Sequence, residues 1–175
     1  MKKKIITLII FSFTILVSAC GSDEDGFEIL FFTEELGTKM DEEMLKKMIK
    51  QKIPEIEEEN FSIIFHVALA EKFFIEIAVH EGDLIFVDED ILNAVVDLED
   101  LALPLDSIVS SGFDKNLKES ETEEENTYAL PLNNEARIIK ELNLELETQV
   151  AGFIPVYGGN NDLSNEIMEY LVSQE

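Results

Sequence analysis

The chain has 175 residues, of which 13 are basic and 38 acidic, so its formal net charge at pH 7 is −25. A protein this acidic does not suit nucleic-acid binding, which needs basic surface to displace counterions from phosphate. Because the chain has 1 cysteine, no internal disulfide can form, and its core alone must hold the fold together.

The first 19 residues have the layout of an export signal. Lys2, Lys3 and Lys4 form a positive start, and Ile5 to Val17 is almost entirely apolar. As a helix, this apolar run would be about 20 Å long, against roughly 30 Å for the hydrocarbon core of a bilayer. It is therefore short for a permanent membrane span, and we interpret residues 1–19 as a signal peptide.

The apolar run ends in Val17-Ser18-Ala19-Cys20, which resembles the lipobox of bacterial lipoproteins. In that family the cysteine receives an S-diacylglycerol and an N-acyl chain, and the peptide before it is removed. The resemblance implies that Cys20 is lipidated and holds the protein in the bilayer at the extracytoplasmic face of the cell membrane. Two alternatives remain open: Cys20 could end a signal anchor as a small apolar residue, or it could form an intermolecular disulfide.

The part of the chain after the signal peptide would be more acidic still. Residues 1–19 contain three lysines and no acidic residue, so their removal leaves a formal charge of −28. Such a domain is repelled by anionic lipid headgroups. Attachment must therefore come from the acyl chains, each of whose buried methylenes contributes roughly 0.8 kcal/mol.

Residues 20–26 read as the lipidated cysteine and an acidic tether, and residues 27–175 as one domain. Strands are expected at 27–33, 61–69 and 83–88. A helix is expected to begin at the N-cap Thr38, carry the apolar stripe Met40, Met44, Leu45, Met48 and Ile49, and end before Pro54. The segment 73–79 fits either a strand or a helix that ends with Gly82 as its C-cap.

The second half of the chain continues with mixed elements. In order, we expect a helix at 91–98, a turn at 103–106, an exposed acidic segment at 115–126, an apolar piece at 128–132, a helix at 136–142, an extended piece at 149–157 and a helix at about 162–172 capped from 158–162. If 73–79 is helical, strands and helices alternate. The chain is then a single α/β domain with a mainly parallel sheet covered by helices.

Side chains that could bind a metal or catalyse a reaction form no specific pattern. The densest group is His80, Glu81, Asp83, Asp88, Glu89 and Asp90. It has neither the alternating oxygen ligands of a calcium loop nor the spaced His and Cys of a zinc site, so we interpret it as a polar loop and predict no metal site.

We also predict no catalytic or cofactor-binding residue, and hence no enzyme. His66 lies in an apolar strand, where a histidine with one satisfied hydrogen bond is the simplest interpretation. No serine lies in a Gly-x-Ser-x-Gly elbow. Gly158-Gly159 precedes Asn160 rather than a basic residue, unlike a phosphate-binding loop.

Several short phrases resemble the extracellular solute-binding lipoproteins that feed ABC importers. They are Gly82-Asp83-Leu84-Ile85-Phe86, Leu103-Pro104-Leu105-Asp106, Tyr128-Ala129-Leu130-Pro131, Phe153-Ile154-Pro155-Val156-Tyr157 and the helix Asn165 to Val172. The resemblance implies a shortened chain that folds like one lobe of a periplasmic-binding-protein fold. About 30 residues stand where the family inserts its second lobe, so no family binding residue is carried over.

Three functions follow as hypotheses. The first is a non-enzymatic accessory or degenerate solute-binding component linked to an ABC importer. The second is an envelope interaction or structural lipoprotein that binds a protein partner and no small molecule. The third is an acidic buffer that binds calcium weakly and without fixed stoichiometry.

Overall fold

In the described part of the chain, the core is a five-stranded sheet in the order β2-β1-β3-β5-β4. In this computed structural model, residues 26–56, 60–95, 97–112 and 126–174 are described. The strands are β1 (Phe27–Phe32), β2 (Phe61–His66), β3 (Leu84–Asp88), β4 (Leu130–Leu132) and β5 (Val150–Phe153). The helices are α2 (Glu34–Lys39), α3 (Glu42–Lys52), α4 (Ala70–Val79), α5 (Glu89–Val95), α6 (Leu98–Leu101), α7 (Asp106–Gly112), α8 (Arg137–Glu141) and α9 (Asn161–Val172).

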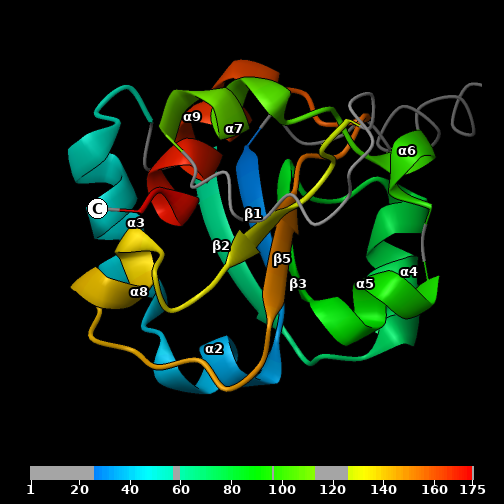
Figure 1. Cartoon of the computed structure of the whole chain (residues 1–175), viewed down its shortest axis with the longest axis horizontal. Helices are drawn as coiled ribbons and strands as arrows, with labels where there is room; N and C mark the ends of the chain where they lie inside the picture. Colours follow the sequence, from blue (N-terminus) through cyan, green and yellow to red (C-terminus); the bar gives the residue numbers. More distant parts are fainter. Residues whose placement is uncertain (1–25, 57–59, 96, 113–125, 175) are drawn as a thin grey trace, which may run out of the picture.

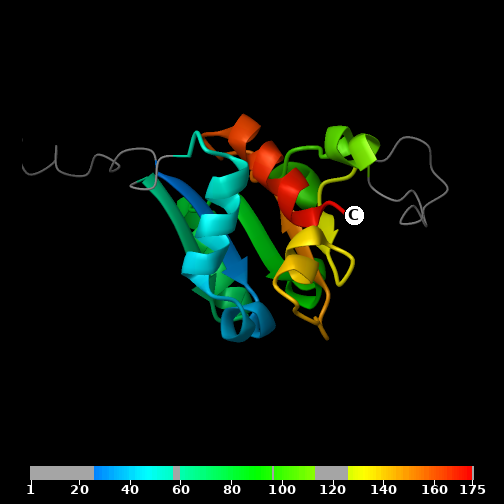
Figure 2. The same cartoon turned by 90° about the vertical axis from the view of Figure 1, so that its left-hand side faces the viewer.

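Helices cover both faces of this sheet (Figure 1). The helices α3, α8 and α9 lie on one side, and Figure 2 shows them in front of the strands, whereas α4, α5 and α6 lie on the other side. The chain moves from β1 to β2 in one direction and then passes back across β1 to reach β3. Because crossovers between parallel strands are right-handed, these opposite moves place α3 and α4 on opposite faces.

The apolar run of β1 supplies both halves of the core. Successive side chains of a strand point to opposite faces, so Ile29 and Phe31 join the cluster beneath α3 and α9, and Leu30 and Phe32 join the cluster beneath α4. Both clusters are fully packed around this strand, since each of these four side chains is at most 1% exposed. A continuous apolar sequence is therefore what a strand buried on both sides requires.

The expected single α/β domain is confirmed, but its sheet is mixed, whereas a mainly parallel sheet was expected. Strands β2 and β3 pair parallel to β1, but β5 pairs antiparallel to both β3 and β4. Half of the pairings between described strands are thus antiparallel. Strand β5 begins beside the end of β3, where the backbone N–H of Glu89 donates to the carbonyl of Gln149. The segment 73–79, which the sequence left ambiguous, lies in helix α4.

Two expected helix caps were wrong. Thr38 lies inside α2 and its hydroxyl donates to the carbonyl of Glu35, while the N-cap of α3 is Asp41, whose carboxylate accepts from the N–H of Met44. Gly82 does not cap α4, because His80 already takes the left-handed conformation there with φ of 65°. In both cases a residue closer to the helix end makes the capping contact first.

The other expected elements match the structure within a few residues, including the end of α3 before Pro54 and the cap of α9 by Asn160. The apolar stripe of α3 centres on Leu45 and Ile49, which are buried, whereas Met44 is 49% exposed. The acidic segment 115–126 lies outside the described residues apart from its last residue, and residues 1–25, with the signal peptide, Cys20 and most of the tether, lie outside them entirely.

Gly152 in β5 provides a test of how tightly the sheet and α9 are packed. A Cβ at this position would lie 2.4 Å from a ring carbon of Phe86 and 3.1 Å from the terminal methyl of Met168. We expect Gly152→Ala to lower the free energy of unfolding by about 1–3 kcal/mol, as overpacked cores do.

Urea unfolding followed by circular dichroism measures this change, and Gly37→Ala is the matched control. A Cβ at Gly37 would lie 3.6 Å from Phe65 in ordinary contact, and Gly37 is helical, so alanine there should be neutral or stabilising. Equal stability of Gly152→Ala and the unsubstituted chain would contradict the packing described here.

Candidate functional site

The carboxyl ends of β1 and β3 are the first place to look for a binding site. From β1 the chain continues to β2 on one side, and from β3 it continues to β4 on the other side. These neighbouring parallel strands therefore form a topological switch point. Open α/β sheets bind ligands in the crevice outside such strand ends. The polar side chains at this edge come from Thr33 and Glu35, which follow β1, and from Asp88, which ends β3.

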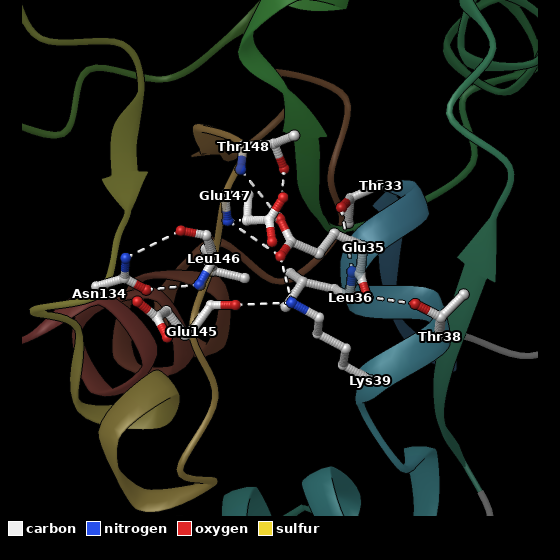
Figure 3. A network of polar contacts seen from close by, with 10 residues as sticks. All are labelled: Thr33, Glu35, Leu36, Thr38, Lys39, Asn134, Glu145, Leu146, Glu147 and Thr148. Atoms are coloured by element: carbon white, nitrogen blue, oxygen red, sulfur yellow. Dashed lines mark hydrogen bonds and ion pairs between the residues drawn. The ribbon is translucent and has the colours of Figure 1, made fainter.

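The carboxylate of Glu35 binds a segment of the same chain that lies more than 100 residues away in sequence (Figure 3). It accepts hydrogen bonds from the backbone N–H of Glu147 at 2.9 Å and from the backbone N–H and the hydroxyl of Thr148 at 3.0 and 2.9 Å. It also forms an ion pair with Lys39, one turn further along α2. The carboxylate therefore binds groups of its own chain.

Further contacts hold the segment 145–148 in the same place. The ammonium of Lys39 donates to the carbonyl of Glu145 at 2.8 Å. The side chain of Asn134 bonds both backbone groups of Leu146, accepting from its N–H at 2.7 Å and donating to its carbonyl at 3.0 Å. The chain just before β5 is therefore fixed from both sides, to α2 and to the residues after β4 (Figure 3).

These contacts control the ionisation of Glu35. Partial burial acts to raise the pKa of this carboxyl, but hydrogen bonds from Lys39, Thr148 and Glu147 outweigh it and lower the pKa from 4.5 to about 2. Glu35 is thus ionised throughout the neutral and mildly acidic range. A negative charge and its hydrogen bonds persist at this edge of the sheet.

Asp88 is the second carboxyl group at the carboxyl edge. Burial raises its pKa, and hydrogen bonds from the hydroxyl of Thr33 and the backbone of Glu34 partly offset this effect. Its Oδ1 is buried and makes no hydrogen bond to any residue that the structure describes. Thr33 is itself the N-cap of α2 and accepts from the N–H of Leu36, so the polar atoms of this edge are mostly bound to one another.

A hollow of about 650 Å³ lies at the opposite edge, where β1, β2 and β3 begin. It is lined by Gly26, Phe27, Glu28, Ser62, His80, Glu81, Gly82, Asp83, Tyr157, Gly158, Gly159 and Asn160. Burial is the main cause that raises the pKa of Glu28, and the negative charges of Glu81 and Asp83 add to it. The hollow is therefore acidic, and the neighbouring negative charges disfavour the ionised form of Glu28.

Asp83 holds this end of the sheet together. Its Oδ2 accepts from the N–H of Glu28 and its Oδ1 from the N–H of Gly159, both at 3.0 Å. Beside it, the ring of His80 stacks on that of Tyr157 at 4.7 Å, and the phenol hydroxyl of Tyr157 donates to the carbonyl of Glu81. The turn before α9 is thus bound to the loop before β3, which gives Asp83 a structural role.

The structure divides the polar group that the sequence singled out. His80, Glu81 and Asp83 lie at the amino end of β3, while Asp88, Glu89 and Asp90 lie at its carboxyl end. The five residues of β3 separate the two halves by about 16 Å, at roughly 3.3 Å a residue. Within the described residues, no group of three or more His, Cys, Asp and Glu side chains could share a metal ion.

His66 is placed at the carboxyl end of β2, where its ring stacks on Phe32 at 4.8 Å. Burial lowers its pKa, and the positive charge of Lys72 adds to this effect. Glu35, which organises the carboxyl edge, was missed by sequence reasoning. The local signal is only a capped helix start, and the partners of Glu35 are distant in sequence.

Comparison with known proteins finds a relative in sequence. No protein-family model matches the chain, and no solved structure matches it. The chain is 25% identical to this relative over 174 residues, which cover 98% of each chain. That relative is "Putative lipoprotein YteS" of Bacillus subtilis (strain 168). In the described part of the chain, no helix is both long and apolar enough to cross a membrane.

The lowered pKa of Glu35 makes a prediction about pH. A carboxyl group whose pKa falls on folding stabilises the protein above its unfolded pKa, and this contribution is lost as pH drops through the folded pKa. We expect Glu35→Gln to be less stable than the unsubstituted chain at pH 7, by about 1 kcal/mol for these largely exposed hydrogen bonds. The deficit should shrink as the pH falls from 4.5 towards about 2.

Urea unfolding at a series of pH values measures the deficit. Glu34→Gln is the matched control, because Glu34 is the neighbouring exposed glutamate. A deficit that stays constant from neutral pH to pH 2, or an equal deficit in both variants, would show that the Glu35 charge does not hold the segment 145–148.

Proposed function

We propose that this chain is a lipoprotein anchored at the extracytoplasmic face of the cell membrane by acyl chains on Cys20. Support comes from the lipobox-like residues 17–20 and from end-to-end similarity to a protein named as a lipoprotein. The position of the domain also agrees, since β1 begins at Phe27, a few residues after Cys20. An anchored Cys20 would therefore be joined by a short segment to β1, an inner strand of the sheet.

We further propose that the domain is not an enzyme and acts in the envelope by binding a protein partner rather than a solute. One observation carries this proposal: Glu35 binds the segment 145–148 across the carboxyl edge. A solute binding at the carboxyl ends of β1 and β3 would have to break these charge-assisted hydrogen bonds, which are stronger than neutral ones. The edge at which an α/β sheet would bind a solute is thus bound to its own chain.

A second candidate is an accessory or degenerate solute-binding component linked to an ABC importer. The chain order β1, α2, α3, β2, α4, β3, in which helices separate three parallel strands, supports it. The solute-binding lipoproteins that the sequence resembles also begin one lobe with alternating strands and helices. In this account Tyr128 to Pro131, the phrase that marks the crossing to a second lobe in that family, leads into β4 at the sheet edge.

A thermal-unfolding screen against sugars, amino acids, short peptides and calcium separates the two candidates. A solute at a hundred times its dissociation constant would stabilise the domain by about 2.7 kcal/mol. The protein-partner proposal expects no saturable shift with any solute. A saturable shift from one solute class that is lost in Asp88→Asn would favour the importer-linked role.

Replacement of Cys20 tests the anchor. We expect Cys20→Ala to abolish labelling by a radioactive fatty acid and to prevent removal of the signal peptide, because acyl transfer needs the cysteine sulfur and amine. Labelling and mass spectrometry of the expressed chain measure both effects. Ser18→Ala is the matched control and should be lipidated normally; unchanged labelling of Cys20→Ala would exclude this anchor.

A further inference from the structure

Helix α4 presents an apolar face to solvent. Phe74, Ile75 and Val79 are 48%, 57% and 59% exposed, and Ala78 between them is also exposed. On a helix, residues three and four apart are neighbours, so these four side chains form one continuous stripe, here called the outer face of α4. Two more exposed apolar residues, Val67 and Leu69, lie in the turn that leads into the helix.

The opposite face of α4 already supplies the packing that the fold needs. Phe73 is fully buried, and its ring contacts those of Phe32 at 5.3 Å and Phe153 at 6.3 Å. The helix lies on the outside of its layer (Figure 1). A surface helix is normally polar on its outward side, and a helix that is apolar all round is normally covered. The outer face of α4 is thus apolar beyond what the domain requires.

We propose that the outer face of α4 is a docking surface for an extracytoplasmic segment of a membrane protein. The contact surface of this partner is apolar at its centre and basic at its rim. This inference rests on the proposed function, because it takes the anchor at Cys20 as given. It names the surface and the chemistry of the partner that the domain binds.

The length of the tether argues for a partner in the membrane. From Cys20 to Gly26 the chain can extend at most about 21 Å, at roughly 3.5 Å a residue. Gly26 and His80, which follows the last residue of α4, both line the hollow at the edge where β1, β2 and β3 begin. An anchor at Cys20 therefore keeps this end of α4 within reach of proteins that project from the bilayer.

Charge argues for a basic rim and against other occupants. Glu71 lies at the first turn of α4, and Glu81 follows its end. Lys72 is paired with Glu76 along one flank. A formal charge of −28 for the chain without residues 1–19 repels both anionic lipid and a second copy of the chain, and it attracts a basic partner. Apolar contact at the centre and opposite charge at the rim are the usual division of an interface.

A pair of synthetic helical peptides tests the surface on the full chain purified from membranes. Both peptides carry the same leucine face; one is flanked by lysines and the other by glutamates. We expect saturable binding of the lysine-flanked peptide in fluorescence anisotropy, and binding weaker by roughly tenfold or more for the glutamate-flanked one. Ile75→Asp should weaken binding of the lysine-flanked peptide by roughly tenfold.

The matched control is Met44→Asp. Met44 is 49% exposed on α3, on the opposite side of the sheet, so this variant adds the same charge elsewhere. Binding should be unchanged in Met44→Asp, and both variants should keep the melting temperature of the unsubstituted chain. Equal loss in the two variants, equal binding of the two peptides, or no binding would overturn the proposal.

Two further measurements exclude the other occupants. Analytical ultracentrifugation that shows a dimer lost in Ile75→Asp would assign the face to a second copy and overturn the proposal. The same holds for a lipid surface if Cys20→Ala binds phosphatidylglycerol vesicles more strongly than Cys20→Ala with Ile75→Asp, because both variants retain residues 1–19 and differ only on the outer face of α4. Failure of the anchor is distinct from all of these, because it would appear as absent fatty-acid labelling while the peptide still binds.

Discussion

The arrangement of this domain depends on the hydrogen bonds that Glu35 accepts from Glu147 and Thr148. Residues 145–148 lead directly into β5, the antiparallel strand that joins β3 to β4. By fixing this segment to α2, Glu35 connects the parallel half of the sheet to its antiparallel half. The same contacts use the polar groups at the strand ends where an open α/β sheet would bind a ligand.

The two edges of the sheet therefore differ in their polar contacts. At the carboxyl edge, charged and capping groups are bound to one another, and Asp88 and Glu35 have pKa values displaced in opposite directions by burial and by hydrogen bonds. At the amino edge, Asp83 ties strand starts and a turn together around an acidic hollow. The amino edge is the one next to Gly26, and so the proposed anchor at Cys20 would hold it towards the membrane.

Much of the fold could be predicted from local sequence because local chemistry determines it. The apolar run of β1, the helix stop before Pro54 and the cap of α9 by Asn160 each depend on a few adjacent residues. The direction of β5 could not be predicted, because it depends on pairing with β3 more than 60 residues earlier in the chain. The caps at Asp41 and His80 were missed because neighbouring residues compete for the same helix ends.

The candidate site was harder to predict for the same reason. With 38 acidic residues in the chain, no single carboxylate stands out, and what distinguishes Glu35 is its contact with backbone groups far away in sequence. The polar group around β3 appeared continuous along the chain, yet the strand carries its two halves to opposite ends of the sheet. Residues that are close in sequence are therefore not close in space here, and a shared site requires closeness in space.

Amide hydrogen exchange at Glu147 and Thr148 tests the central claim most directly. If Glu35 binds the segment 145–148 across the carboxyl edge, both amides should exchange slowly at neutral pH in the unsubstituted chain and much faster in Glu35→Gln. Fast exchange of both amides in the unsubstituted chain would show that this edge opens readily. It would contradict the account that the domain's own chain occupies the strand ends where an open α/β sheet would bind a ligand.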